Sequence, residues 1–238
     1  MFRSSPAHVL SFHRFVPVTL GRGAFAPILG FAAIFAVFGA QTGIPFGTAA
    51  VLGGVGGTAS LLVHEFGHVR AARRLAGIRS ASVSLIWLGA ATRLEGRYRS
   101  GSEQARVAVA GPRASFGFAG ALTALAFLPF PAAIEKAVLL LALLNVALGL
   151  LNLVPAAPLD GYKLVLGLLW SATGSERRAR RTIARVGRLA LFVVPPATVA
   201  LLAVSPGLGF AVAVMALTLV AQRQLTRRPD RARGSNSR

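Results

Sequence analysis

Apolar residues gather into six long stretches that are separated by shorter polar or charged segments. These stretches are Ala24–Ala40, Thr48–Leu75, Val107–Leu128, Ile134–Leu153, Leu189–Val204 and Gly207–Gln222. A helix needs about 20 apolar residues to cross a hydrocarbon core of about 30 Å, and several stretches reach that length. The pattern predicts an all-α polytopic membrane protein with about six transmembrane helices. The fifth stretch is short and contains Pro195-Pro196, so the sequence does not define its ends.

Charged residues are few and strongly biased towards one sign. The 238-residue chain has 26 Lys and Arg against 7 Asp and Glu, a formal net charge of +19, and only 14% charged residues. This composition excludes a disordered tail, a collagen-like chain and most soluble folds. The chain has no cysteine, which excludes disulfide frameworks and thiolate chemistry.

The basic residues lie in alternate connections between the apolar stretches. Basic segments are the N-terminal lead, Ile78–Arg106, Glu176–Arg188 and the tail after Gln222. The intervening connections, Gln41–Gly47, Phe130–Lys136 and Ser205-Pro206, carry no net charge. The positive-inside rule then places both termini in the cytoplasm. We expect a multi-pass protein of the cytoplasmic membrane of a bacterium.

Three regions follow from this distribution. We expect a cytoplasmic N-terminal lead at residues 1–23, a six-helix membrane domain at 24–223 with its core at about 48–171, and a basic, disordered cytoplasmic tail at 224–238. A signal peptide is the alternative interpretation of the first stretch. The 22-residue lead is long for a signal peptide, and Phe38-Gly39-Ala40 is a poor cleavage site. These two features favour an uncleaved membrane helix.

The basic segment at Glu176–Arg188 suggests either nucleic acid or lipid as a partner. Arg177, Arg181, Arg185 and Arg188 share one helical face, and no aromatic residues are interleaved for base stacking. This pattern favours an interfacial helix on anionic membrane lipid, with no nucleic-acid partner.

Hydrophobic and polar residues alternate between Ala81 and Glu95, and Gly89-Ala90-Ala91 interrupts the alternation. Alternation of this kind predicts a β-hairpin, here on the cytoplasmic side of the second helix. Its exposed edge could pair with an extended segment of another protein. The alternative is a re-entrant loop without that role.

Glycines at Gly53-Gly54-Val55-Gly56-Gly57 resemble a phosphate-binding loop only superficially. No Lys-Ser/Thr pair follows them, and a membrane helix comes next in place of a soluble βα unit. Close helix packing or a distorted first helical turn explains them better.

The second stretch contains His64-Glu65-Phe66-Gly67-His68. Histidines four residues apart share one helix face, so both imidazoles can bind one metal ion. Glu65 can reach a metal-bound water as general base. In a soluble helix, a pair of hydrogen-bonded histidines would be an equally good interpretation. In a membrane helix three ionisable residues are costly, which favours a functional site.

A catalytic zinc site needs a third protein ligand. Outside the His64–His68 segment, Asp160 is the only acidic residue embedded in apolar sequence. Pro155 and Pro158 precede it and break the fourth stretch. Asp160 is therefore either a metal ligand or the N-cap of a helix at Gly161–Trp170. Imidazole and carboxylate also suit cobalt or iron, but tetrahedral geometry and hydrolytic use favour one Zn²⁺ per chain.

Three motifs in this order resemble the site-2 protease family of intramembrane zinc metalloproteases. The sequence has His64–His68 as H-E-x-x-H, Ala110-Gly111-Pro112 as A-G-P, and Asn152–Gly161 as N-x-x-P-x-x-P-L-D-G. The resemblance implies that His64, His68 and Asp160 bind zinc and that Glu65 is the general base. It also implies that Asn152 holds the substrate or the oxyanion near the metal.

The resemblance has two departures. Many members have Asn three residues after the proline of A-G-P, where this chain has Ser115, so a polar role there is in doubt. The chain also has no PDZ insertion and no CBS pair, so we expect it to be a short member.

The family cleaves transmembrane helices of other proteins, often membrane-tethered regulators that another protease has already trimmed. We therefore expect a peptide hydrolase whose partner is a transmembrane protein substrate. Two alternatives remain open, a non-proteolytic membrane scaffold or chaperone and a metal transporter. An intact Glu65 argues against the first, and the single polar cluster argues against the second.

Overall fold

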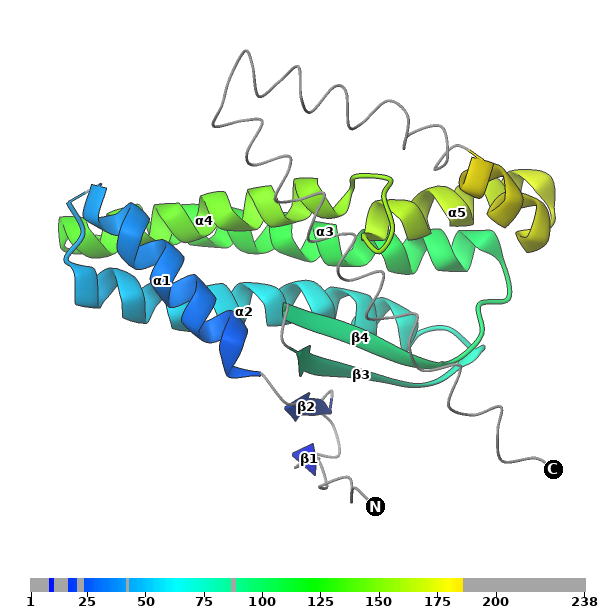
Figure 1. Cartoon of the computed structure of the whole chain (residues 1–238), viewed down its shortest axis with the longest axis horizontal. Coiled ribbons are helices and arrows are strands. Elements are labelled where there is room, and N and C mark those ends of the chain that lie inside the picture. Colours follow the sequence, from blue (N-terminus) through cyan, green and yellow to red (C-terminus); the bar gives the residue numbers. More distant parts are fainter. Residues whose placement is uncertain (1–8, 11–16, 21–23, 42, 87–88, 186–238) are drawn as a thin grey trace, which may run out of the picture.

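A computed structural model describes residues 9–10, 17–20, 24–41, 43–86 and 89–185 of the chain (Figure 1). The fold is mostly helical with one small sheet. The helices are α1 (Phe25–Gln41), α2 (Phe46–Ala72), α3 (Gly101–Leu125), α4 (Ala132–Asn152) and α5 (Asp160–Thr173), and residues 176–185 are also helical. The strands are β1 (Val9–Leu10), β2 (Val18–Leu20), β3 (Ile78–Ile86) and β4 (Gly89–Gly96).

The first four apolar stretches are all helices. Helices α2, α3 and α4 run side by side along the long axis of the molecule, and α1 crosses α2 (Figure 1). In the described part of the chain, α2 and α4 are the helices long and apolar enough to cross a membrane. The two last stretches lie outside the described residues, so six crossings remain a prediction.

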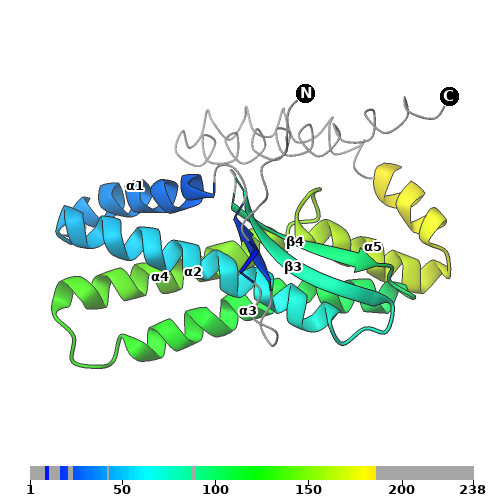
Figure 2. The ribbon, with the colours of Figure 1, turned by 90° about the horizontal axis from the view of Figure 1, so that it is seen from below.

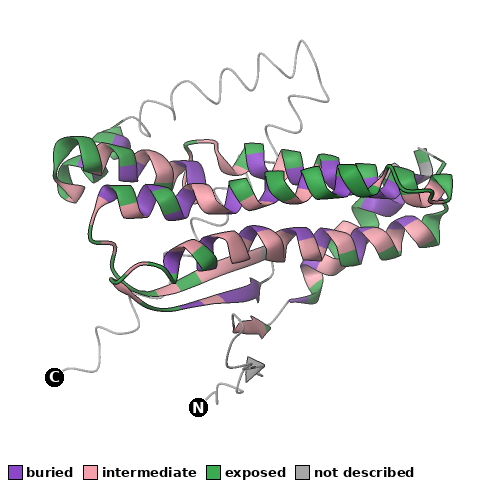
Figure 3. Cartoon of the chain, turned by 180° about the vertical axis from the view of Figure 1, so that it is seen from behind, coloured by how far each residue is buried: buried purple, intermediate pink, exposed green. Residues whose placement is uncertain are grey.

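The apolar side chains of α4 point outward as well as inward. Leu139, Leu143, Val146 and Leu150 recur at helical spacing and are exposed, while Leu141 is buried. Figure 3 shows exposed and buried positions alternating along the helices. A helix that is apolar all round belongs in a large core or in a membrane. Since these leucines face away from the protein, lipid is their natural surrounding.

Glycines of α2 set how closely its neighbours approach. A Cβ at Gly53 would lie 2.2 Å from Phe35 Cβ of α1, and one at Gly56 would lie 2.5 Å from Leu141 Cδ1 of α4. The prediction of close helix packing is therefore confirmed. The alternative, a distorted first turn, is wrong because α2 is a continuous helix from Phe46 onward.

The sheet has the strand order β1-β2-β3-β4 and lies along the C-terminal half of α2 (Figure 2). Strands β3 and β4 form the predicted antiparallel hairpin, and β2 pairs with β3 in parallel. The N-terminal lead thus contributes two short strands that the sequence pattern did not predict. The partner of β2 in the sheet, β3, lies more than 60 residues away. Buried Val69, Val83 and Val107 join α2, the sheet and α3 in one apolar cluster.

Helix α3 begins earlier than its apolar stretch. Ser100 Oγ accepts a hydrogen bond from the Glu103 backbone N–H at 3.3 Å, and the Glu103 carboxylate accepts one from the Arg99 N–H at 2.7 Å. This reciprocal capping of exposed donors starts the helix at Gly101, although its first turns are polar. The hydropathy pattern had placed the start at Val107.

Prolines separate α4 from α5. Pro155 and Pro158 lie in the connection between Asn152 and Asp160, as the sequence predicted. Both helices pack against α3 on either side of this break. The break brings the first residue of α5 to the middle of α3, opposite the histidines of α2.

Candidate metal centre

Helix α2 presents two buried imidazoles on one face. His64 and His68 are four residues apart in a continuous helix and are only 3% and 4% exposed. Their Nε2 atoms lie 3.3 Å from one another. The i, i+4 spacing has therefore produced the shared face that the sequence predicted.

Asp160 completes this cluster from α5. Its Oδ2 atom lies 3.0 Å from His64 Nε2 and 2.8 Å from His68 Nε2, and the residue is 3% exposed. Helix α5 begins at Asp160 itself, and its preceding N-cap position, Leu159, makes no side-chain cap bond. The interpretation of Asp160 as an N-cap is therefore wrong, because its carboxylate faces the histidines.

The three side chains fit the ligand set of a zinc ion. Ligand atoms about 2.0–2.1 Å from a tetrahedral zinc are about 3.3 Å apart, close to the three separations found here. These residues form a group whose donor atoms all lie within 4.8 Å of one another. Two neutral imidazoles and one carboxylate leave a fourth position open, as in catalytic zinc sites.

The second nitrogen of each imidazole is also held. His68 Nδ1 lies 2.7 Å from the Val107 carbonyl oxygen, so it donates its proton there and leaves Nε2 with a lone pair. His64 Nδ1 lies 2.9 Å from Ser115 Oγ, and Ser115 is fully buried. The doubt about a polar role for Ser115 is therefore removed, since it orients His64. Such outer partners fix the tautomer and the ring orientation of metal-binding histidines.

Lys163 holds the other oxygen of the Asp160 carboxylate. Its Nζ lies 2.9 Å from Asp160 Oδ1, one helical turn along α5, and the side chain is half exposed. With Oδ1 engaged by the ammonium group, Oδ2 is the oxygen that faces the imidazoles. The ion pair thus favours a monodentate carboxylate ligand.

Glycines bring α3 against the imidazoles. A Cβ at Gly111 would lie 2.2 Å from His68 Nε2 and 2.7 Å from His64 Nε2, and one at Gly67 would lie 2.5 Å from the Ala110 carbonyl oxygen. The A-G-P motif therefore supplies the one residue type that fits beside both histidines. Gly111 belongs to the site because its backbone lies directly against both imidazoles.

Glu65 faces the sheet. It is half-buried, and its Oε2 accepts a hydrogen bond of 2.5 Å from Thr92 Oγ1 on β4. This hydrogen bond therefore joins the residue that directly follows His64 to the hairpin. Thr92 was not singled out from the sequence, because a threonine in a strand is an ordinary β-forming residue.

Asn152 is not hydrogen-bonded to the cluster. It is the last residue of α4, and its Nδ2 donates to the Leu148 carbonyl oxygen at 3.0 Å within its own helix. The structure brings His64, His68 and Asp160 together, places Glu65 beside them, and leaves the amide of Asn152 turned to its own backbone.

A second buried polar pair joins α2 and α4 one turn before His64. Asn145 Nδ2 donates to Ser60 Oγ at 2.8 Å and to the Leu141 carbonyl oxygen at 2.8 Å, and both polar residues are fully buried. Ser60 precedes His64 by four residues, so it shares the histidine face. In the sequence, the four-residue spacing from His64 was the one indication that Ser60 shares the histidine face. A single serine at this spacing is weak evidence.

Tyr98 lies near the cluster, in the connection between β4 and α3. Burial and the negative charge of Asp160 raise the pKa of Tyr98 to about 12. The phenol therefore stays protonated at neutral pH and is unsuited to act as a base.

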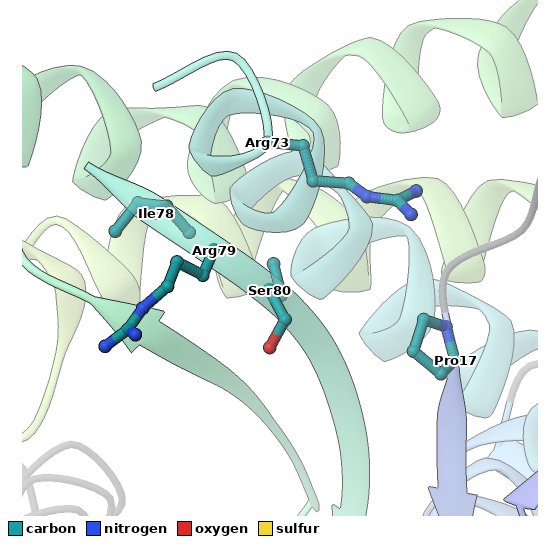
Figure 4. Close-up of a pocket in the computed structure, with 6 residues that line it drawn as sticks. Pro17, Arg73, Ile78, Arg79 and Ser80 are labelled. Carbon is teal, nitrogen blue, oxygen red and sulfur yellow. The ribbon is translucent and has the colours of Figure 1, made fainter. Parts of the chain in front are cut away.

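The surface hollow at the far end of the sheet is a separate feature. This cavity of about 230 Å³ is lined by Pro17, Arg73 and residues 78–81 (Figure 4). It contains none of the predicted site residues.

Comparison with known proteins agrees with this geometry. The sequence profile of Peptidase family M50 matches residues 55–136 and 130–194, a region that contains every residue of the cluster. The chain therefore belongs to Peptidase family M50. The resemblance to the site-2 proteases is confirmed at the level of the family.

Two curated relatives show similarity over the same part of the chain. "Putative zinc metalloprotease Rip3" of Mycobacterium tuberculosis is 40% identical over 140 residues, which are 57% of this chain and 35% of that protein. "Putative zinc metalloprotease sll0528" of Synechocystis sp. is 33% identical over 131 residues, which are 55% of this chain and 34% of that protein. The similarity thus spans about a third of the length of these relatives.

A solved structure has the same fold. The site-2 protease from Methanocaldococcus jannaschii matches with a TM-score of 0.55 and 18% identity, over 90% of this chain and 92% of that one. At this level of identity the match concerns the fold alone. The described helices therefore share the overall fold of that protein.

Proposed function

We propose that this protein is an intramembrane zinc metallopeptidase that hydrolyses peptide bonds in the transmembrane segments of membrane-tethered proteins. The observation that carries this proposal is the buried cluster of His64, His68 and Asp160. The two histidines and Glu65 lie within a helix apolar enough to cross a membrane. Buried ionisable groups in such a helix are costly and usually serve a function.

His64, His68 and Asp160 are the proposed ligands of one zinc ion. When bound, zinc lowers the pKa of a coordinated water to about 7 and polarises the scissile carbonyl. The chain's part is to keep both Nε2 atoms and Oδ2 directed at one point. Ser115, the Val107 carbonyl and Lys163 do this by holding the opposite atoms of the three side chains.

Glu65 is the proposed general base. Its carboxylate takes a proton from the attacking water and returns it to the amine that leaves when the peptide bond breaks. Its contact with Thr92 on β4 supports this role, since a substrate lying along β4 would pass beside it.

Strand β4 is the proposed binding edge for the substrate. In the described sheet, β4 lies at one end of the order β1-β2-β3-β4, so one side of it has no strand partner. A helical substrate hides its amide groups in its own hydrogen bonds and must unwind before attack. Pairing with an edge strand offers the extended segment new backbone partners.

Asn152 is proposed to hold the substrate or the oxyanion. Because its amide donates to Leu148 within α4, this role requires the side chain to turn towards the cluster. Its place at the end of α4, directly before the break that leads to Asp160, supports the proposal.

The proposed setting is the cytoplasmic membrane of a bacterium, with several crossings and both termini inside. The helix at residues 176–185 supports contact with anionic lipid headgroups. It packs on α5 through buried Ala179 and Ile183, and its arginines are exposed. Glu176 offsets one of them, Arg180, in an ion pair.

Two measurements on the detergent-purified protein test the proposal together. We expect about one zinc per chain in the wild type, the same in Glu65→Gln, and loss of zinc in His68→Ala and Asp160→Ala. We also expect Glu65→Gln to reduce cleavage of a co-expressed membrane-tethered reporter by at least about 100-fold, because it lacks a base. A scaffold or chaperone would keep its biological activity in Glu65→Gln, and wild-type cleavage by this variant would contradict the proposal.

A further inference from the structure

A hydrogen bond joins the proposed general base, Glu65, to the proposed substrate-binding strand, β4. The sequence motifs contain Glu65 but no residue of β4. Thr92 Oγ1 lies 2.5 Å from Glu65 Oε2 and 3.3 Å from the Glu65 carbonyl oxygen. A hydroxyl has one proton to donate, and the shorter contact goes to the carboxylate. Within the described part of the chain, Thr92 is the hydrogen-bond partner of this carboxylate and engages Oε2, which leaves Oε1 to receive the proton of the water.

The direction of the Thr92 backbone follows from the register of the sheet. Thr92 lies opposite Val83 of β3, and the Val83 N–H donates to the Pro17 carbonyl oxygen on the β2 side at 3.0 Å. The backbone groups of Val83 therefore face away from β4, so Val83 and Thr92 form a non-hydrogen-bonded pair. The N–H and C=O of Thr92 then point to the open edge of β4.

The same alternation sets the direction of the side chains. Ala90 and Leu94, two residues on either side of Thr92, pack in the apolar cluster against α2. Every second residue of β4 thus turns its side chain to α2 and its backbone groups to the open edge. Thr92 is the member of this set whose side chain reaches Glu65.

We propose that Thr92 is a positioning residue for Glu65 and that it links substrate binding at the edge of β4 to the general base. An extended substrate that pairs with the backbone of Thr92 fixes the residue whose hydroxyl holds the carboxylate. The base is then held in place when a peptide lies along the strand. This inference rests on the proposed peptidase activity and adds a residue that the family motifs do not contain.

The alternative is that Thr92 is only a β-forming residue whose hydroxyl takes the nearest acceptor. Two substitutions separate these roles. Thr92→Val keeps the shape and the β-propensity but removes the donor, and Thr92→Ser keeps the donor. Thr19→Val is the matched control, because it removes a hydroxyl from the same sheet that contacts Ser84 at 2.7 Å and does not reach Glu65.

The first measurement is kinetic. The probe is a quenched-fluorescent peptide with an Ala/Leu/Gly core, chosen from a library for cleavage by the full zinc-loaded wild type in detergent. For Thr92→Val we expect kcat to fall about 10-fold to 100-fold, as for loss of a hydrogen bond to a charged group, with KM changed less than about twofold. Thr92→Ser should restore most of kcat, and Thr19→Val should match the wild type.

A second variant tests the edge without touching the hydroxyl. Ala90 lies opposite Leu85 and has the same backbone direction as Thr92, so Ala90→Pro removes one N–H from the open edge. We expect it to raise KM and to leave kcat within about twofold. A Thr92→Val variant with the same profile, raised KM and unchanged kcat, would show that Thr92 only binds substrate and would overturn the inference.

A spectroscopic measurement tests the inference without requiring catalytic turnover. The carboxylate stretch of Glu65, assigned in the infrared difference spectrum between wild type and Glu65→Gln, should shift in Thr92→Val and return in Thr92→Ser. An unshifted band overturns the positioning role, whatever the kinetics. If the wild type cleaves no peptide and no reporter, the peptidase proposal fails, and the band still decides whether Thr92 holds Glu65. Cleavage by the wild type with unchanged kcat in Thr92→Val overturns the inference alone.

Discussion

Each metal-facing atom of the candidate centre is directed by a contact on the far side of its own side chain. Ser115 and the Val107 carbonyl hold the Nδ1 atoms of His64 and His68, and Lys163 holds Oδ1 of Asp160. Buried polar groups without such partners would cost free energy and would turn to other acceptors. The direction of the three ligand atoms is therefore a property of these outer residues as much as of the ligands.

At the residue scale, Ser115→Ala should weaken zinc binding. It removes the partner of His64 Nδ1 in a fully buried place, and loss of such partners typically lowers metal affinity about 10-fold to 100-fold. Competition with a chelator measures the affinity. Thr123→Ala is the control, because its hydroxyl donates to the Ala119 carbonyl within the same helix. Equal zinc affinity in Ser115→Ala and the control would contradict this role.

Lys163→Met should also weaken zinc binding, by a smaller factor than Ser115→Ala. The ammonium group is half exposed, so solvent reduces the strength of its ion pair with Asp160. The apolar stem of methionine keeps the packing of the lysine side chain. The same chelator competition measures the effect, and a tighter zinc site in Lys163→Met would contradict the orienting role.

At the scale of elements, the distance between α2 and α3 decides whether the site exists. Gly67 and Gly111 allow the backbones to meet where the imidazoles lie, and Ser100 and Glu103 begin α3 early enough to reach them. The proline break then sets Asp160 at the start of α5, and α5 also packs against α3. Helices α2, α3 and α5 meet at the cluster because the small residues of α2 and α3 and the proline break before α5 all lie at the level of the histidines.

Gly111→Ala should abolish stoichiometric zinc binding while the chain remains folded. Its Cβ would lie 2.2 Å from His68 Nε2, so one or both imidazoles must move. Gly117→Ala on the same helix is the matched control, because nothing lies within 4 Å of its Cβ. Alanine is the better helix former, so the control should keep its zinc and its melting temperature. Zinc retained at one per chain in Gly111→Ala would contradict the packing argument.

At the scale of the whole molecule, the connections lie at two ends. The α1–α2 and α3–α4 connections are at one end of the helices, and the link from α2 to the sheet is at the other (Figure 1). This is the alternation that the basic and uncharged segments predicted for the first four stretches. It leaves open which end faces the cytoplasm, and the charge pattern alone makes that assignment.

The absence of cysteine allows a direct test of this topology. Gln41→Cys lies in the uncharged connection and Ser102→Cys at the basic end, and both residues are exposed. In intact spheroplasts, a membrane-impermeant maleimide should label Gln41→Cys and should label Ser102→Cys only after lysis. The reverse result would invert the orientation, and labelling of both before lysis would contradict a membrane-spanning α2.

The sequence by itself predicted most of the described helices and strands and the candidate metal ligands. Local patterns predicted helices α1 to α4, the hairpin and the proline break, because apolar runs, alternation and proline act on neighbouring residues. The i, i+4 histidines shared a face for the same reason. The choice of Asp160 between ligand and cap stayed open until the structure placed its carboxylate 2.8 Å from His68, because a helix cap and a metal ligand use the same residue type.

Only the tertiary structure decided which distant side chains meet. Ser115, Val107, Lys163 and Thr92 are ordinary residues in ordinary elements, and no local pattern marks them as partners of the site. The pairing of β2 with β3 likewise depends on contacts across more than 60 residues. Helix and strand formation follow from short-range geometry, whereas contacts between elements follow from how the small residues at Gly67 and Gly111 let those elements pack.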